Sequence, residues 1–424
     1  MERLEVIASF DWLEQEETIG YLEYDSLKGR DVFSFEFTKQ WIKSHPDIIL
    51  GGDLQPFTGK QYAEPGRGIF GCFADCLPDF WGRLLMDLKA KHSAGRMVKL
   101  SDWDYLKGVE DTLRVGGFRF KNSDTGHYLN YSENYQVPPI ISIDALVEAA
   151  QKIEEEEFSQ DGPDNRWIER LLKPGTSVGG ARPKACVTDG KDLYIAKFPS
   201  TVDRWNEGRW EYFANKMAEL CGIQTTESRL IPSGIGHDIF LSKRFDRTAD
   251  GKRVHMASAL NMLGVTLEEA QKDLHSYHEI ADFMALNGTH VEQSIQELYR
   301  RIAFNICIGN ADDHLKNHSF LLTKKGWELS PVYDINPSIF ETHSLLIDGI
   351  SNKSSLDNLY KAHQLYRLDK DTAYDIIEEV TRNMKSWKSI ASDCSISDGE
   401  MELFSQRFEI AREPLRYSKQ VAPM

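Results

Sequence analysis

Apolar and polar residues alternate along the first forty residues of the chain, as they do in strands that bury one face. Residues 32–37, Val-Phe-Ser-Phe-Glu-Phe, are the clearest stretch. A segment rich in Gly and Pro follows from Gly51 to Gly68, and the apolar spacing over residues 70–88 then predicts a helix. We therefore expect a small α+β unit over residues 1–125.

Helical spacing governs much of the remaining chain. Apolar residues recur at intervals of three and four over residues 143–158 and 205–220. The longest such series ends at Ile306 and is followed by Gly309, where a helix would end. The pattern predicts an α+β fold with a mixed middle unit, residues 126–254, and a mostly helical last unit, residues 255–424.

Composition limits the classes of function. The chain has 424 residues, 41% of them hydrophobic, and its 50 Lys and Arg against 66 Asp and Glu give a net charge of −16. Such an acidic chain is a poor candidate for a primary nucleic-acid binder, because phosphate contacts need a basic surface. The six cysteines are scattered without metal-ligand spacing, so we expect reduced, buried thiols. Without a signal peptide or an apolar segment of membrane-spanning length, the expectation is a cytoplasmic protein that does not contact the membrane.

A glycine loop and a hairpin form the first group of candidate residues. Gly179-Gly180 lies among small residues, where backbone N–H groups can approach an anion closely. Two strand-like segments, residues 184–188 and 192–198, then flank Asp189-Gly190, a strong hairpin signal. Lys197 shares one face with apolar residues of its strand, so its ammonium either meets a buried anion or reaches solvent at the strand end. Glu211, in the helix predicted over residues 205–220, could pair with Lys197, but a surface position is the simpler interpretation.

A cluster of acidic and amide side chains forms the second group. Asp312 and Asn317 lie five residues apart after the helix that ends at Gly309, and Asp334 follows a predicted hairpin over residues 319–329. Protein kinases use this order: one Asp orients and deprotonates a hydroxyl, while an Asn and a later Asp hold Mg²⁺. Mg²⁺ needs few protein ligands, since it keeps waters and phosphate oxygens. The pattern therefore indicates a phosphotransferase.

The motifs resemble those of the HipA-like serine/threonine kinases, the toxins of bacterial toxin–antitoxin modules. The resemblance runs through residues 21–37, 71–85 and 116–120, and then through five kinase motifs. These motifs are residues 177–184, 196–199, 243–247, 312–317 and 333–334. It implies a two-lobed, protein-kinase-like fold with an extra N-terminal α+β subdomain.

The same resemblance implies roles for individual residues, with ATP and Mg²⁺ as cofactors. Asp312 would be the catalytic base, Asn317 and Asp334 would bind the metal, and Ser177 would be autophosphorylated as an off switch, with Thr176 as a neighbouring alternative. A phosphoserine beside a phosphate-binding loop would repel ATP. The implied ATP-binding residues are Gly179, Gly180, Ala181, Arg182, Lys184, Lys197, Lys243, Arg244, Phe245, His314, Lys316, Asn317, Tyr333 and Asp334. Asp313 and Lys243 depart from the residues common in the family.

Partners and alternatives follow from the resemblance as well. Members of the family phosphorylate translation components such as aminoacyl-tRNA synthetases and are neutralised by a small helix-turn-helix antitoxin, through which they reach DNA indirectly. A non-catalytic kinase-like co-repressor and a small-molecule kinase remain as alternatives. The sequence leaves the substrate, the antitoxin and the oligomeric state open.

Overall fold

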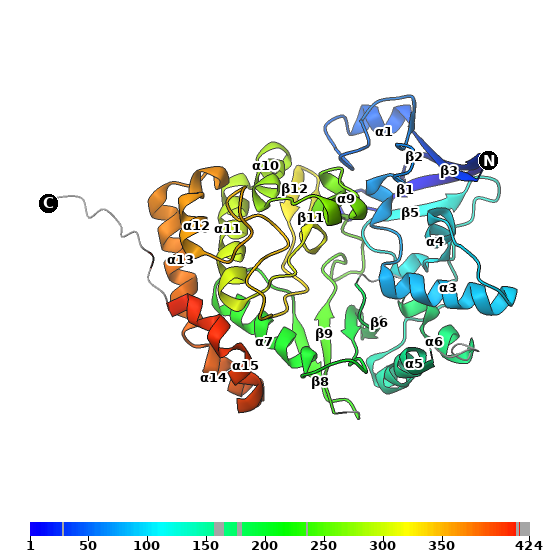
Figure 1. Ribbon diagram of the computed structural model, residues 1–424. Coiled ribbons are helices and arrows are strands. Elements are labelled where there is room, and N and C mark those ends of the chain that lie inside the picture. The colour runs from blue at the N-terminus through cyan, green and yellow to red at the C-terminus, as the bar shows by residue number, and fades with distance from the viewer. Residues whose placement is uncertain (28, 157–164, 176–179, 235, 413–414, 416–424) are drawn as a thin grey trace.

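The computed structural model describes residues 1–27, 29–156, 165–175, 180–234, 236–412 and 415. These residues form three antiparallel sheets, and helices gather at the C-terminal end of the molecule and below the N-terminal sheet (Figure 1). The predicted α+β fold class is confirmed. All six cysteines are buried and free, as expected. None of the helices in the described ranges is long and apolar enough to cross a membrane.

The N-terminal sheet has the strand order β4-β3-β2-β1-β5. Phe33, Phe35 and Phe37 are all buried on β3, as their alternation predicts. Short helices close the sheet on one side. The elements are β1 Glu2–Ala8, β2 Glu17–Leu27, β3 Arg30–Phe37, α1 Lys39–Ser44, β4 Lys60–Tyr62, α4 Asp102–Gly108 and β5 Phe118–Asn122.

The helix predicted over residues 70–88 is wrong in one respect, because the chain breaks it in two. Helix α2 covers Gly71–Ala74 and α3 covers Phe80–Ala94. Pro78 lies between them, and a proline lacks the backbone N–H that a continuing helix needs. Asp79 then begins α3 as its N-cap, with the side chain accepting from the backbone N–H of Phe80 at 2.8 Å.

The second sheet, β6-β7-β9-β8, is covered by α3, α5 and α6. Its core joins Trp81 and Leu85 of α3 to Ala185, Tyr194 and Leu241 of the sheet. A helix from the first predicted unit thus packs on the sheet of the second, and the boundaries at residues 125 and 254 stay predictions. The elements are α5 Ile143–Glu156, α6 Asn165–Gly175, β6 Lys184–Asp189, β7 Asp192–Lys197, α7 Glu207–Leu220, β8 Ser228–Ile231 and β9 Ile239–Lys243.

The last part of the chain is helical around a small sheet, β10-β11-β12. Helix α11 passes through its centre and buries most of its length. The strands are β10 Met256–Ser258, β11 Ser319–Thr323 and β12 Gly326–Leu329. The helices are α8 Ala259–Met262, α9 Leu267–Lys272, α10 Tyr277–Asn287, α11 Val291–Ile308, α12 Leu356–Lys361, α13 Lys370–Met384, α14 Trp387–Asp393 and α15 Asp398–Phe408.

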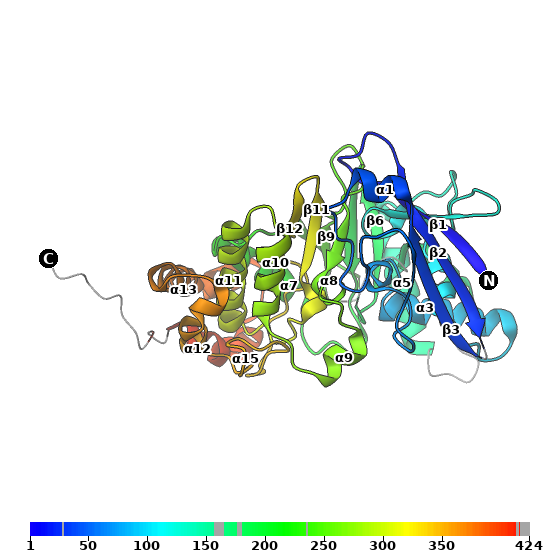
Figure 2. The same cartoon turned by 90° about the horizontal axis from the view of Figure 1, so that it is seen from above.

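One hydrophobic core runs from the N-terminal sheet into the C-terminal region, although Figure 2 shows the five-stranded sheet and α11–α15 at opposite ends. The rings of Phe10 and His255 stack with centroids 4.7 Å apart. The indole N–H of Trp327 donates to the carbonyl of Ile49 at 3.0 Å. The N-terminal sheet is therefore packed against the C-terminal region over a large apolar interface.

Candidate active site

Helix α11 leads directly into the acidic loop, residues 310–317. The helix ends at Gly309, which adopts the left-handed conformation with φ 76°. A side chain there would also meet the carbonyl oxygen of Ser338 at 2.5 Å, so only glycine fits both constraints. The loop from Asn310 to Asn317 follows, closes with a short 3-10 turn, and leads into β11.

The two adjacent aspartates of this loop lie in opposite environments. Asp313 is buried and accepts hydrogen bonds from Tyr277 Oη at 2.8 Å, Asn305 Nδ2 at 2.6 Å and His318 Nε2 at 2.8 Å. Burial opposes ionisation, but His318 and the hydrogen bonds lower the pKa of Asp313 below its usual range. Asp313, which departs from the residue common in the family, therefore anchors the acidic loop to the protein core.

Asp312 is exposed beside the other candidate residues. Partial desolvation and the nearby Asp334 carboxylate raise the pKa of Asp312, while His314 acts in the opposite direction. A raised pKa favours a carboxylate as a general base, because it accepts a proton more readily. The Nδ1 atom of His314 is buried without a hydrogen-bond partner in the described part of the chain. Asn317 lies across the loop, and its Nδ2 donates to the carbonyl of Asp312 at 3.2 Å.

Lys197 joins the second sheet to the acidic loop. Its ammonium lies 2.7 Å from Glu211 Oε1 on α7 and also pairs with Asp334. The side chains of Lys197 and Glu211 are only 11% and 5% exposed. Glu211 is therefore buried, and its interpretation as a surface residue was wrong. Lys197 meets the buried carboxylate of Glu211 and the half-buried carboxylate of Asp334, so the alternative of a lysine that reaches solvent is excluded.

Asp334 adopts a strained backbone conformation. Its φ of 58° is unusual for a residue other than glycine. Its Oδ1 accepts from Lys197 and from Asn336 Nδ2, the latter at 3.2 Å. Burial opposes ionisation, yet Lys197 and Lys184 lower the pKa of Asp334 well below its usual range. An ionised carboxylate is thus held at the position the sequence assigns to the second metal ligand.

The beginning of the second sheet places another cation beside Lys197. Lys184 is 4% exposed and stands opposite Lys197 in the register of β6 and β7. Burial, and then the charge of Lys197, lower the pKa of Lys184 to about 8. Two ammonium groups at such short range favour an anionic ligand between or beside them.

The glycine loop is only partly described. Thr176, Ser177 and Gly179 lie outside the described residues, so the predicted phosphorylation site is among them. Gly180 has a φ of 96°, and a side chain there would collide with the ammonium of Lys184. Ala181 is exposed, and Arg182 turns away: its Nη1 donates to Asp203 at 2.7 Å and its Nε to the Phe198 carbonyl at 2.9 Å. The guanidinium of Arg182 thus binds Asp203 and Phe198 of the protein itself. The contact expected between Arg182 and a nucleotide is therefore limited to its backbone atoms.

The side chains of Lys243 and Arg244, two predicted ATP-binding residues at the end of β9, also have partners within the protein. Lys243 pairs with Asp192 at 2.6 Å. The guanidinium of Arg244 is buried against Asp246 and donates to the carbonyl of Leu113 at 2.8 Å. The guanidinium of Arg244 is thus held inside the protein, so backbone atoms of this residue remain for a nucleotide.

Phe245 and Tyr333 close the other side of this segment. Their ring centroids lie 5.7 Å apart. The hydroxyl of Tyr333 donates to the carbonyl of Lys316 at 2.7 Å and so ties the segment before Asp334 to the acidic loop. Burial raises the pKa of Tyr333 far above its usual range, so its hydroxyl stays protonated.

The donor set fits Mg²⁺ in its chemistry. In the described ranges no three His, Cys, Asp or Glu side chains gather as a metal cluster. Asn317 donates through its nitrogen, which leaves its amide oxygen for a cation, and Asp334 adds a carboxylate. One amide oxygen and one carboxylate suit Mg²⁺, which draws its remaining ligands from water and phosphate.

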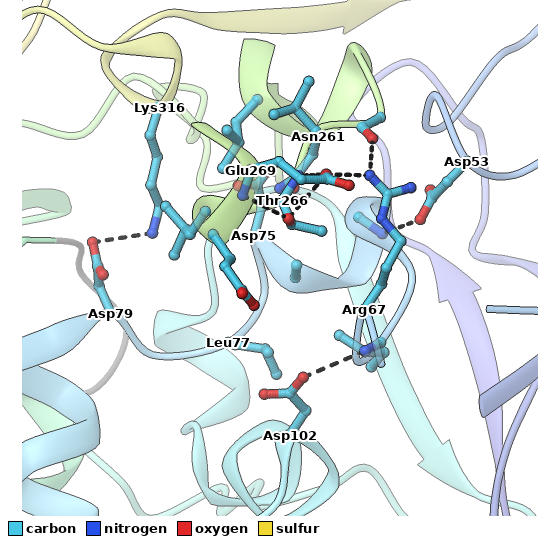
Figure 3. Close-up of a pocket in the computed structure, with 18 of the residues that line it drawn as sticks. Asp53, Arg67, Asp75, Leu77, Asp79, Asp102, Asn261, Thr266, Glu269 and Lys316 are labelled. Carbon is cyan, nitrogen blue, oxygen red and sulfur yellow. Dashed lines mark hydrogen bonds and ion pairs between the residues drawn. The ribbon is translucent and has the colours of Figure 1, made fainter. Parts of the chain in front are cut away.

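A cavity of about 480 Å³ lies beside the acidic loop, between the N-terminal unit and α8–α9 (Figure 3). Lys316 lies at its wall and pairs with Asp79 at 3.1 Å. The cationic side chains that line it are each paired with a carboxylate of the same wall, so the cavity is a poor site for an anion. These pairs are Arg67–Glu269, Arg83–Asp102, Lys272–Glu268 and Lys316–Asp79.

Asp75 and Asp79 are functional candidates that sequence patterns did not reveal. Both lie in residues 71–85, which resemble the N-terminal subdomain of the family. Asp75 accepts from the backbone N–H of Ser258 at 2.7 Å and from its hydroxyl at 2.9 Å. Two carboxylates close to Pro78 are a visible feature of the sequence. Their partners lie about 100 to 240 residues away along the chain, so the sequence could not reveal them.

Comparisons with known proteins relate this chain to a known domain family. The HipA-like C-terminal domain matches residues 176–388. The putative kinase Y4dM of Sinorhizobium fredii is 30% identical over 141 residues, which cover 30% of this chain and 34% of that protein. The toxin YjjJ of Escherichia coli is 24% identical over 351 residues, 78% of this chain and 71% of that protein. The chain thus spans about a third of the length of the first relative.

A solved structure shows the same fold. HipA of Shewanella oneidensis, determined with HipB and operator DNA, superposes with a TM-score of 0.69 at 17% identity, over 96% of this chain and 95% of that one. At this identity the likeness establishes the fold alone. With the domain match over half of its residues, the chain belongs to the HipA-like family.

Proposed function

We propose that this chain is an ATP- and Mg²⁺-dependent protein serine/threonine kinase and the toxin of a toxin–antitoxin module. The observation that carries the proposal is the contact of Lys197 with both Glu211 and Asp334 beside the acidic loop. In protein kinases a strand lysine pairs with a helix glutamate, and a metal-binding aspartate lies next to them. The relative Y4dM is named a putative kinase, which supports the same activity.

Each residue contributes a separate function to phosphoryl transfer. Asp312 accepts the proton of the acceptor hydroxyl, and its raised pKa suits that task. Lys184 and Lys197 offset the negative charge of the phosphates, while Phe245 and Tyr333 offer apolar rings for the base. Asn317 and Asp334 would hold Mg²⁺, which neutralises charge on the phosphates when bound.

The proposal extends to partners and regulation. The solved HipA structure contains HipB and operator DNA, which supports a small helix-turn-helix antitoxin for this chain too. The net charge of −16 suits a toxin that reaches DNA only through such a partner. The protein substrate is a translation component such as an aminoacyl-tRNA synthetase, and phosphorylation of Ser177 or Thr176 switches the kinase off.

The test uses radiolabelled ATP with the purified chain and a cell lysate. Wild type is expected to label a protein band, and Asp312→Asn to lower that rate by about 10²–10⁴-fold while binding ATP normally. Asp282→Asn is the matched control, since Asp282 lies at the surface and, among the residues that the structure describes, pairs with exposed Arg367. Equal labelling by Asp312→Asn would sink the proposal. Label in a metabolite alone would indicate a small-molecule kinase.

Phosphopeptide mass spectrometry of the same samples reports the switch. Phosphate on Ser177 or Thr176 of wild type, absent from Asp312→Asn, is the expected result. Phosphate on neither residue in an active preparation would remove autophosphorylation from the proposal. Proteins phosphorylated in cells by wild type but not by Asp312→Asn identify the substrate.

A further inference from the structure

Asp79 of the N-terminal unit touches two parts of the candidate active site at once. Its Oδ2 lies 3.1 Å from the ammonium of Lys316 in the acidic loop and also accepts from the backbone N–H of Gly180 in the glycine loop. Figure 3 shows Asp79 directed toward Lys316 at the edge of the cavity. Asp79 lies outside the five kinase motifs of the sequence.

The glycine loop is held against helix α3 at a second point. The carbonyl of Gly180 accepts from the backbone N–H of Trp81 at 3.2 Å. Both backbone groups of Gly180 are therefore engaged by the first turn of α3, and its N–H is not directed at a nucleotide. This contact fixes the start of β6, only four residues later, where Lys184 lies.

Asp79 binds a backbone N–H and an ammonium, two groups that also bind phosphate oxygens in nucleotide sites. The side chains of Asp79 and Lys316 are 22% and 27% exposed, so water screens their contact only in part. Burial opposes ionisation of Asp79, but Lys316 and the hydrogen bonds lower its pKa. Asp79 is thus an anion at neutral pH beside the expected phosphate site.

We propose that Asp79 is a positioning residue for phosphoryl transfer, which holds the glycine loop and Lys316 in register from outside the kinase lobes. The proposal rests on the kinase function proposed above. Its two effects on the reaction have opposite signs. The carboxylate aligns the groups that surround the transferred phosphate, which raises kcat, and its negative charge weakens ATP binding, which raises KM.

The test is Asp79→Asn, measured with saturating and limiting ATP. Asparagine is nearly the same size and caps helices as well as aspartate does, so α3 is expected to start normally. The charge and the ion pair to Lys316 are lost. We expect kcat to fall about tenfold or more, and KM for ATP to stay equal or fall about threefold. A purely structural defect would instead raise KM or lower the active fraction.

Two further variants make the result specific. Asp102→Asn is the control, because Asp102 lines the same cavity and bonds only Arg83 and the backbone of Ile69 among the described residues; its kinetic constants are expected to change less than about twofold. Lys316→Met combined with Asp79→Asn tests the route of the effect. If Asp79 acts through Lys316, the double variant is no slower than Lys316→Met alone.

Hydrogen exchange of the peptide that contains Gly180 gives a readout without activity. Faster exchange of that peptide in Asp79→Asn, with Asp102→Asn unchanged, is expected. Unchanged kcat, increased kcat, or equal losses in kcat and affinity would overturn the proposal for Asp79. Wild type that transfers no phosphate would instead overturn the proposed function, and the exchange experiment would still report on the contact.

Discussion

Lys197 pairs with both Glu211 and Asp334, so substitutions in this ion triad are expected to differ in their effect on stability. Replacing Glu211 leaves Lys197 with one partner, whereas replacing Lys197 leaves two carboxylates without their cation. Glu211→Gln removes one charge-assisted hydrogen bond of 2.7 Å and leaves Lys197 paired with Asp334. The expected loss in the free energy of unfolding is about 1.5–3 kcal/mol. Lys197→Met leaves the Glu211 carboxylate, 5% exposed, without its cation. Breaking a buried pair in that way costs about 3–5 kcal/mol. Asp334, whose side chain is 37% exposed, also loses its pair with Lys197, but water can solvate its carboxylate better than that of Glu211.

The cost of Lys197→Met depends on pH, and its sign follows from Glu211. Burial already raises the pKa of Glu211 above its usual range, with Lys197 opposing that shift. Without the lysine the pKa rises further, so folded Glu211 binds a proton that the unfolded chain has already released. A raised folded-state pKa means that stability falls as pH increases. The loss in the free energy of unfolding caused by Lys197→Met, relative to wild type, is therefore expected to be smallest near pH 5.5 and largest near pH 8.

The assay is urea unfolding of wild type, both single variants and the double variant, followed by far-ultraviolet circular dichroism. The double variant lacks the stranded carboxylate, so its loss is expected to be smaller than the sum of the single losses by about 1–3 kcal/mol. The additional pH dependence should also disappear from it. The reasoning is refuted if Lys197→Met near pH 8 costs no more than Glu211→Gln, or if its cost grows toward acid pH.

Three further predictions concern neighbouring residues. Asp313→Asn should lose about 2–3 kcal/mol in thermal or urea unfolding, because three donors converge on its buried carboxylate; an unchanged midpoint would contradict that anchor role. Gly309→Ala should lose about 1–3 kcal/mol by the same measurement, since φ is 76° and the new side chain meets Ser338; a loss below the error would show that the turn relaxes freely. Lys184 is charged below its pKa of about 8, so ATP affinity measured by fluorescence should fall about threefold to tenfold from pH 7 to pH 9, whereas Lys184→Arg should bind almost independently of pH.

Periodicity predicted the elements that carry the active site. The hairpin around Asp189-Gly190 forms as β6 and β7, and the apolar series that ends before Gly309 forms α11. These signals are local: a turn that needs a positive φ and a helix that needs a C-terminal glycine are both written in adjacent residues. The same reasoning failed at residues 70–88, where the apolar spacing continues across Pro78 but the backbone cannot.

Side-chain partners were not predictable in the same way. The five-residue spacing to Asn317 singled out Asp312, but it could not show that Asp313 meets Tyr277, Asn305 and His318. Glu211 was assigned to the surface since an isolated glutamate usually lies there. Its burial follows from α7, whose apolar stripe packs toward the C-terminal helices and turns the glutamate toward β7. Tertiary contacts decided all of these positions.

The arrangement of the two cores explains why the N-terminal unit matters to chemistry at the acidic loop. The N-terminal sheet and the C-terminal region share one hydrophobic core, whereas α3 packs with the second sheet that carries Lys184 and Lys197. The segment from Asp75 to Asp79 connects the two. Asp75 is bonded to Ser258 of the first core, and Asp79 begins the helix of the second and holds the glycine loop. Each end of this five-residue segment is therefore fixed to a different core, and its contacts with Gly180 and Lys316 join both cores to the candidate active site.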